Sequence, residues 1–178
     1  MVIALVSVLV CAALIAALAV QSHRTLSRLR SDADAAFTDL AAELRSRHEL
    51  VPRVLASTER YLGSARYEAS NVATARHAAR TATIGRRGLL RQARAENALS
   101  QALADIFRLV SEDPAGATDP TVTCVRAQVV DLADRVDSSV LRYNTAASRY
   151  MAKRGRSPFA LMTSIFGFAP RETFVLEA

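Results

Sequence analysis

The stretch LSRLRSDADAAFTDLAAEL, residues 26–44, sets the pattern for most of the chain. Its apolar side chains recur every three or four residues, at Leu26, Leu29, Ala33, Phe37, Leu40 and Leu44. This spacing places them on one face of an α-helix, in a heptad-like stripe typical of coiled coils and helical bundles. The stripe continues through Val51, Val54 or Leu55, Thr58 and Tyr61. We therefore expect one long helix that is kinked at Pro52 and ends at Gly63, with Arg47 as a polar interruption of its apolar stripe.

An uncharged run precedes this helix. Residues 2–20, VIALVSVLVCAALIAALAV, form 19 residues without Asp, Glu, Lys or Arg, and a helix of that length approaches the ~30 Å hydrocarbon core of a bilayer. A cleaved signal peptide is one alternative, because residues 17–19 offer a cut site, but no basic residue precedes the run. A lipoprotein signal would need small residues before Cys11, whereas Leu9 and Val10 stand there. We interpret the run as an uncleaved anchor.

The charges beside the span indicate its orientation. Arg24, Arg28 and Arg30 follow the span closely, and only the α-amino group precedes it. Because cytoplasmic flanks carry the excess of Lys and Arg, we expect a single-pass protein of the cell inner (plasma) membrane, with its N-terminus outside and its C-terminal domain in the cytoplasm. Cys11 lies in the span and Cys124 in a helical pattern, so we expect two free thiols.

Three further helical patterns follow. They cover about residues 64–84, residues 89–110 and a helix that begins near Pro120, a residue suited to a first helical position. The turn GRRG, residues 85–88, separates the first two, and SEDPAGATDP, residues 111–120, indicates a loop with an Asp able to cap the next helix. The expected inward positions are Val72, Ala75, Ala79, Leu99, Leu103, Ile106, Phe107, Val110, Val122, Val125, Val129, Leu132, Val136, Val140, Tyr143, Ala147 and Tyr150.

Amphipathic helices each need a partner for their apolar face, so these patterns predict one fold. We expect an all-α protein in which an N-terminal transmembrane helix continues into an antiparallel four-helix bundle with a short aromatic C-terminal tail. The expected divisions are the anchor at residues 1–22, the cytoplasmic bundle at residues 23–156 and the tail at residues 157–178.

Composition supports a helical protein and suggests nothing about a reaction. Six Gly and five Pro in 178 residues indicate few turns and loops. The 22 Arg and one Lys exceed the 17 acids, a bias that GC-rich codon usage explains and that permits contact with anionic lipid. Arg is spread along the whole chain without an aromatic-interleaved basic patch, so we expect no nucleic-acid partner.

Three motifs in order resemble the LemA family of bacterial membrane proteins. RSRHELVPRV, residues 45–54, resembles that family's Arg-x-Asp-Leu-Ile-Pro element, with Glu49 in place of the acid and Val51 in place of the Ile. RYNTAASRYM, residues 142–151, resembles its Tyr-Asn…Tyr-Asn helix, with Met151 in place of the second Asn. SPFALMTSIFGF, residues 157–168, resembles its Phe-Pro…Phe-Gly-Phe tail, with Ser157 in place of the first Phe. The resemblance implies a helical bundle on a membrane anchor, without established enzymatic activity.

A search for reactive groups yields no catalytic set. His23, His48 and His77 lack the second His of a zinc helix, so we expect solvated side chains on polar helix faces rather than a metal site. No Gly-rich phosphate loop and no nucleophile with a marked base are found, so we expect neither a cofactor nor an enzyme.

Four polar residues remain as candidates, in two pairs. For Arg47 and Glu49, one interpretation is a polar layer in which Arg47 pairs with an acid of a facing helix and fixes register, and the other is a partner-binding spot. For Tyr143 and Asn144, one interpretation is that their hydroxyl and amide satisfy groups of the bundle core, and the other is again partner binding.

The C-terminal tail suggests contact with a surface. The basic residues Lys153, Arg154 and Arg156 precede Phe159, Phe166 and Phe168, with Leu161, Met162 and Ile165 between them. These would suit a bilayer interface, with charge on headgroups and aromatics below. Alternatively, the tail tucks against the base of the bundle and shields Leu26 and Leu29, or contacts a neighbouring protomer.

The expected function follows from this inventory. We expect a scaffold or assembly protein that acts through protein–protein contacts, homo-oligomeric ones among them, and through the lipid bilayer. The alternative is a regulatory adaptor of a membrane-bound protease.

Overall fold

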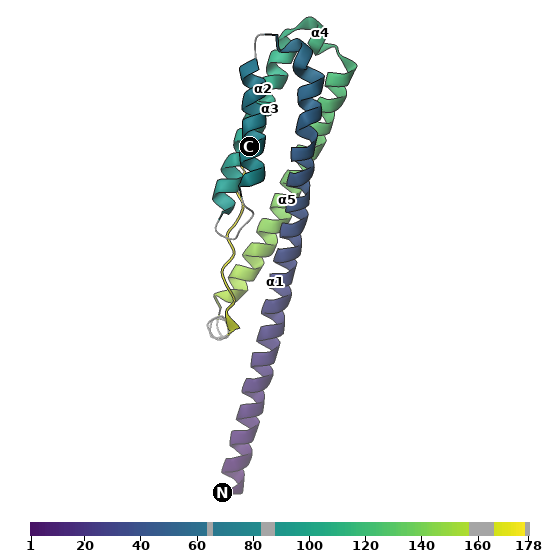
Figure 1. Cartoon of the computed structure of the whole chain (residues 1–178). Coiled ribbons are helices and arrows are strands. Elements are labelled where there is room, and N and C mark those ends of the chain that lie inside the picture. The colour runs from purple at the N-terminus through teal and green to yellow at the C-terminus, as the bar shows by residue number, and fades with distance from the viewer. Residues whose placement is uncertain (64–65, 83–87, 157–165, 177–178) are drawn as a thin grey trace.

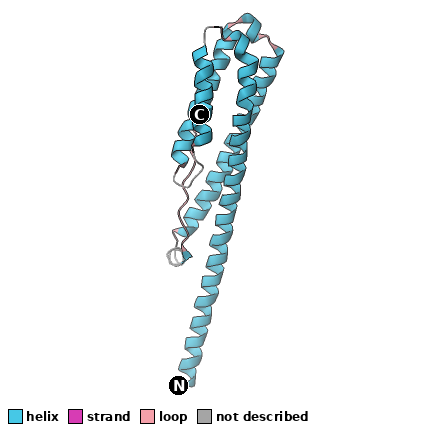
Figure 2. Cartoon of the chain, viewed as in Figure 1, coloured by secondary structure: helices cyan, strands magenta, loops and turns pink. Residues whose placement is uncertain are grey.

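The computed structural model describes residues 1–63, 66–82, 88–156 and 166–176. Their helices are α1 (Val2–Thr58), the short 3-10 helix η1 (Glu59–Tyr61), α2 (Arg66–Thr81), α3 (Leu89–Glu112), α4 (Pro114–Ala117) and α5 (Pro120–Arg154). Figure 1 shows their arrangement, and Figure 2 shows helices joined by loops in these residues, without a strand. The all-α class and the N-terminal helix that continues into a helical bundle are thus confirmed.

The membrane-spanning run and the first bundle helix form one element. α1 has 57 residues without a break, which corresponds to about 85 Å. Its first part extends beyond the other helices (Figure 1), and the side chains of Ile3, Leu9 and Ile15 are 86%, 62% and 67% exposed there. Among the described helices it is the one long and apolar enough to cross a membrane. Lipid accommodates such a surface far better than water does, so the N-terminal part of α1 suggests a single membrane anchor within the described residues.

Four long helices form the bundle, but they do not have equal length. α1 and α5 run side by side, and the pair α2–α3 covers the part of them farthest from the span (Figure 1). α2 and α3 have 16 and 24 residues, about 24 and 36 Å, against 35 residues and about 52 Å for α5. The α2–α3 pair therefore leaves the span-proximal part of the α1–α5 seam without a helical cover.

The predicted stripes do supply the core. Fourteen of the seventeen inward positions expected in the helices after α1 are buried, and Leu99 and Ile106 among them are 0% exposed, as are Val51 and Val54 of α1. Ala75, Val129 and Val140 lie at the margin, half-buried. The periodicity therefore located the packed faces correctly.

The tail completes the core beyond the point where α2 ends and α3 begins. Residues 166–176 run back along α1 and α5, and Phe174, which is 1% exposed, packs with Leu40, Leu44 and Tyr143. Phe168 packs with Leu26 at the end nearest the span. Two aromatic side chains thus replace a third helix, and each contributes roughly 2–3 kcal/mol of burial.

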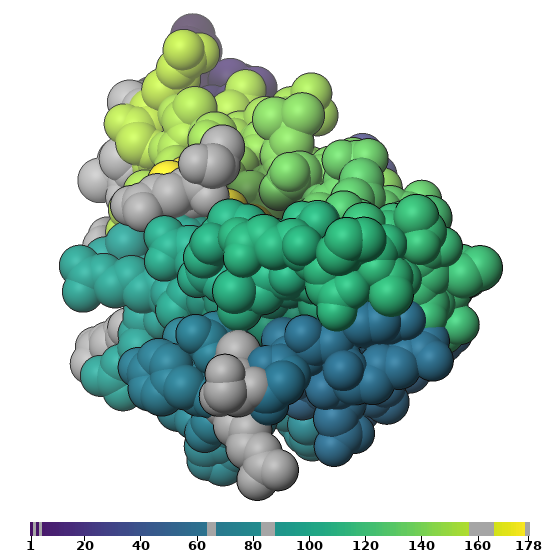
Figure 3. All heavy atoms as spheres, turned by 90° about the horizontal axis from the view of Figure 1, so that it is seen from above, coloured from purple at the N-terminus to yellow at the C-terminus, as the bar shows by residue number. Residues whose placement is uncertain are grey.

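The far end of the bundle differs from the expected loop at residues 111–120. α3 continues to Glu112, and residues 114–117 form α4. The carboxylate of Asp113 accepts from the amide of Ala115 at 2.8 Å, and that of Asp119 accepts from the amide of Thr121 at 2.6 Å. Each Asp-Pro pair therefore supplies a helix cap and a first-turn proline, which outweighs the loop-like composition. Figure 3 looks down on this end, where α4 and the end of α1 form one contiguous surface.

Pro52 and Gly63 are the two residues at which we expect a kink and a stop in α1. The helix continues through Pro52 to Thr58 and gives way to η1. The chain then turns at Gly63, whose φ of 49° suits glycine, as expected for the stop.

Candidate functional site

A polar cluster lies inside the bundle between α1 and α3. Its centre is Glu96, whose side chain is fully buried. One carboxylate oxygen lies 2.8 Å from Nε2 of His48, and the other lies 3.6 Å from Nη1 of Arg47. Nη2 of Arg47 donates to Oγ of Ser100 at 2.6 Å. We call Arg47, His48, Glu96 and Ser100 the polar cluster, and it contains the expected pairing of Arg47 with an acid of a facing helix.

His48 corrects one expectation and Glu49 does not join the cluster. His48 was expected to be solvated, yet it is 7% exposed and lies against Glu96. The reason is that α1 packs against α5 on one side and α2–α3 on another, so its buried face is wider than a heptad stripe. Glu49 is exposed at the margin of the bundle.

Pro52 explains a contact from α2. A proline lacks the N–H that would bond the carbonyl four residues earlier, so the carbonyl oxygen of His48 has no partner in its own helix. Nε of Arg76 donates to this oxygen at 2.7 Å. α2 is therefore tied to α1 at the point where proline leaves an open acceptor.

Burial sets the electrostatics of the polar cluster. Desolvation lowers the pKa of the Arg47 guanidinium, against the attraction of Glu96 and Asp137, which raises it. Arginine remains protonated at neutral pH, so Arg47 and Glu96 form a buried ion pair. Such a pair adds little net stability but penalises any register of α1 against α3 that separates its members.

Tyr143 and Asn144 hold the tail rather than groups within the helices. The hydroxyl of Tyr143 donates to the carbonyl of Glu172 at 2.7 Å. The amide of Asn144 donates to the carbonyl of Phe174 at 2.7 Å and accepts from its N–H at 2.8 Å. All these bonds involve the backbone of the tail, so Tyr143 and Asn144 fix its course. The side chain of Phe174 is held separately, by apolar packing.

Charge adds to this fastening. Arg171 forms an ion pair with Asp34 of α1. Burial raises the pKa of the Tyr143 hydroxyl; Arg171 lowers it, while Asp34 and Glu172 raise it. The tail therefore binds a neutral phenol beside a partly buried ion pair.

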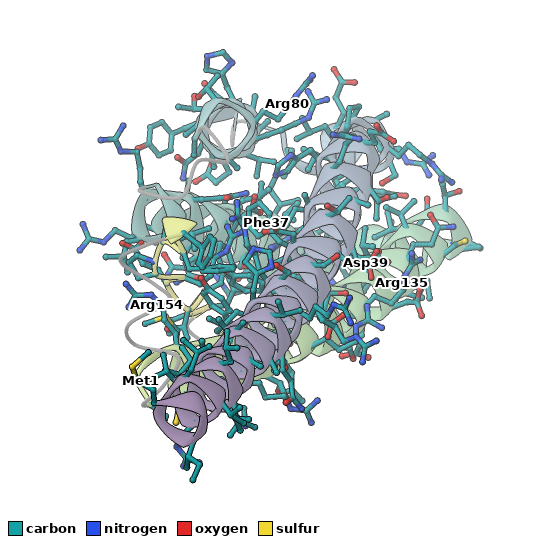
Figure 4. All side chains as sticks on the ribbon, turned by 90° about the horizontal axis from the view of Figure 1, so that it is seen from below. Met1, Phe37, Asp39, Arg80, Arg135 and Arg154 are labelled. Carbon is teal, nitrogen blue, oxygen red and sulfur yellow. The ribbon has the colours of Figure 1, made fainter. Side chains whose placement is uncertain are left out.

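The span-proximal end contains the residues expected at a membrane surface. Lys153 and Arg156 are exposed, and Phe166 is 51% exposed, with its ring 4.9 Å from that of His23. Arg154 lies on the tail side (Figure 4), where its Nε donates to the carbonyl of Phe168 at 2.9 Å. Phe168 is 4% exposed against Leu26, as the tucked arrangement requires, whereas Phe159 lies outside the described residues.

One protein family matches the bundle and the tail. The model of the LemA family matches residues 36–178. This chain belongs to the LemA family. The match begins inside α1, after the apolar run, and covers the rest of the bundle together with the tail. A search of curated proteins finds no match.

The LemA-like motifs coincide with the two sites described above. The element at residues 45–54 carries Arg47, His48 and Pro52, and the element at residues 142–151 carries the side chains that fasten the tail. LemA is not a known enzyme family. Among the described residues, no three His, Cys, Asp or Glu side chains come close enough to hold a metal ion.

Sequence reasoning missed Glu96, Ser100, Gln92 and Arg76. Each is one of many similar residues on a helix, and only packing selects it. The open carbonyl four residues before Pro52 was the one available signal, because it required a donor from another helix.

Proposed function

We propose that this LemA protein is a membrane-anchored scaffold that acts through protein–protein and membrane contacts, without catalysis. The observation that carries the proposal is the unbroken course of α1 from Val2 to Thr58. A hinge after the span would let the bundle turn freely, whereas a continuous helix fixes its orientation relative to the bilayer. Surfaces that bind other proteins are then presented at a constant height and angle.

The charges beside the span support a bundle on the cytoplasmic side of the membrane. Arg24 and Arg28 are exposed beside the span, as are Lys153 and Arg156 at the end of α5. Basic side chains next to a span favour the cytoplasmic side and anionic headgroups. The proposal therefore has the N-terminus outside and the bundle in the cytoplasm of an inner-membrane protein, with Phe166 at the lipid surface.

Purification from native membranes in a mild detergent tests the proposal. The particle mass and the mass-spectrometric identity of co-purifying proteins are measured. A homo-oligomer, or a complex with structural membrane proteins, supports the scaffold. A stoichiometric membrane protease supports the alternative of a regulatory adaptor, and a monomer without partners contradicts both.

A further inference from the structure

A cavity of about 290 Å³ lies beside the polar cluster, between α1, α2 and α3. Its polar lining comprises Arg45, His48, Glu49, Arg76, Arg80 and Gln92. Small-molecule sites range upward from about 300 Å³, so the cavity suits a small ligand.

Gln92 is the feature that packing does not explain. The side chain is 2% exposed and lines the cavity, yet its Oε1 atom has no hydrogen-bond partner in the described part of the chain. A buried acceptor without a donor is costly, and such groups are rare in folded proteins. The cavity therefore offers an acceptor that a ligand with a hydroxyl or amine would satisfy.

The remaining polar lining is mainly basic. Arg45, Arg76 and Arg80 take part in no ion pair between described residues, and Glu49 is the acid among the lining side chains. Nε of Arg76 is already bound to the carbonyl of His48, which holds its guanidinium in place. Arg80 projects from α2 on the side that faces α1 (Figure 4). The cavity thus combines three guanidinium groups, of which that of Arg76 is held by a hydrogen bond, with one buried acceptor.

We propose that this cavity binds a small oxyanion that keeps a hydroxyl group at neutral pH, of the class of hydrogen phosphate. The charged oxygens accept from Arg76 and Arg80, since guanidinium matches phosphate geometry. The P–OH group donates to Oε1 of Gln92. Arg45 lies about 37 Å along α1 from Val20, so a bilayer headgroup does not reach the cavity and the ligand comes from solution.

Calorimetry on the full chain in nanodiscs of zwitterionic lipid, titrated with inorganic phosphate, tests the site. We expect one saturable site with a dissociation constant below about 1 mM. Sulfate has the same shape but no hydroxyl at neutral pH, so it should bind at least about five-fold more weakly, the equivalent of one hydrogen bond. The absence of saturable phosphate binding overturns the proposal, and tighter binding of a phosphoserine peptide assigns the cavity to a protein partner instead.

Matched variants assign the binding to these residues. Arg80→Gln should weaken phosphate binding about ten-fold, because it removes a charge-assisted bond. Arg94→Gln makes the same change at an exposed position of α3 outside the cavity and should leave binding unchanged. Gln92→Leu should abolish the preference for phosphate over sulfate without lowering the ligand-free melting temperature, because it removes a buried amide oxygen that has no donor among the described residues. Equal losses in the two Arg variants, or a retained preference in Gln92→Leu, contradict the assignment.

Discussion

Removing the carboxylate of Glu96 should destabilise the bundle more than its size suggests. In the Glu96→Leu variant, Arg47 keeps its bond to Ser100 but loses the charge that faces it at 3.6 Å, while the side chain remains 8% exposed. An uncompensated buried charge costs about 3–5 kcal/mol. We expect a loss of this size in the free energy of unfolding.

The double variant Arg47→Met with Glu96→Leu isolates the electrostatic part. Both partners of the ion pair are then apolar and of similar volume, so the charge penalty is removed. His48 still lacks its contact with Glu96, so the free energy of unfolding should stay about 1–3 kcal/mol below that of the wild type. The double variant should therefore be about 2 kcal/mol more stable than Glu96→Leu.

Urea unfolding of the full chain in detergent, followed by far-ultraviolet circular dichroism, measures these changes. The midpoint should fall in Glu96→Leu and recover in part in the double variant, with an unchanged slope. If Glu96→Leu unfolds at the wild-type midpoint, or if the double variant is no more stable than the single one, the buried ion pair does not govern packing here.

Three further outcomes are expected. Phe174→Ala should lower the free energy of unfolding by about 3–5 kcal/mol and expose residues 166–176 to limited proteolysis. Val175→Ala, at a neighbour that is 57% exposed, should change it by less than about 0.5 kcal/mol, and equal effects would show that the tail is not bound through Phe174. The raised pKa of Tyr143 favours the protonated phenol in the fold, so its contribution to stability is present below the ordinary tyrosine pKa and is lost as pH rises through the raised value. The melting temperature should therefore fall more between pH ~9 and pH ~11 in the wild type than in Tyr143→Phe, and identical falls would refute this. Cys124 is exposed on the bundle, so a membrane-impermeant maleimide should label it only after cell lysis, and labelling of intact spheroplasts would reverse the proposed orientation.

The sequence was most informative where a periodic pattern decides the structure. The stripe from Leu26 to Leu44 predicted the α1 core face, and Leu26, Leu40 and Leu44 are buried as expected. The apolar run was equally clear, because an uncharged helix of that length has few stable surroundings. The family resemblance added the elements that later proved to carry the polar cluster and the tail contacts.

Single polar residues were less predictable, because their role depends on which helix faces them. The neighbours of His48 in sequence predict a solvated side chain, but its ring bonds inside the bundle to Glu96, 48 positions later. The tail was ambiguous for a related reason. Its aromatic residues suit lipid or protein equally well, and the difference in length between α5 and the α2–α3 pair leaves an open seam that Phe168 and Phe174 fill.

Photocrosslinking in living cells tests the central claim that the anchored bundle works through protein contacts. A photoreactive residue is placed in the full chain at each of four exposed positions on three helices, namely Tyr67, Leu90, Val130 and Leu141, with the fully buried Leu99 as control. We expect discrete intermolecular adducts, with this chain or with a second protein, from at least one exposed position and none from Leu99. Absence of intermolecular adducts from all four exposed positions would contradict the proposed scaffold.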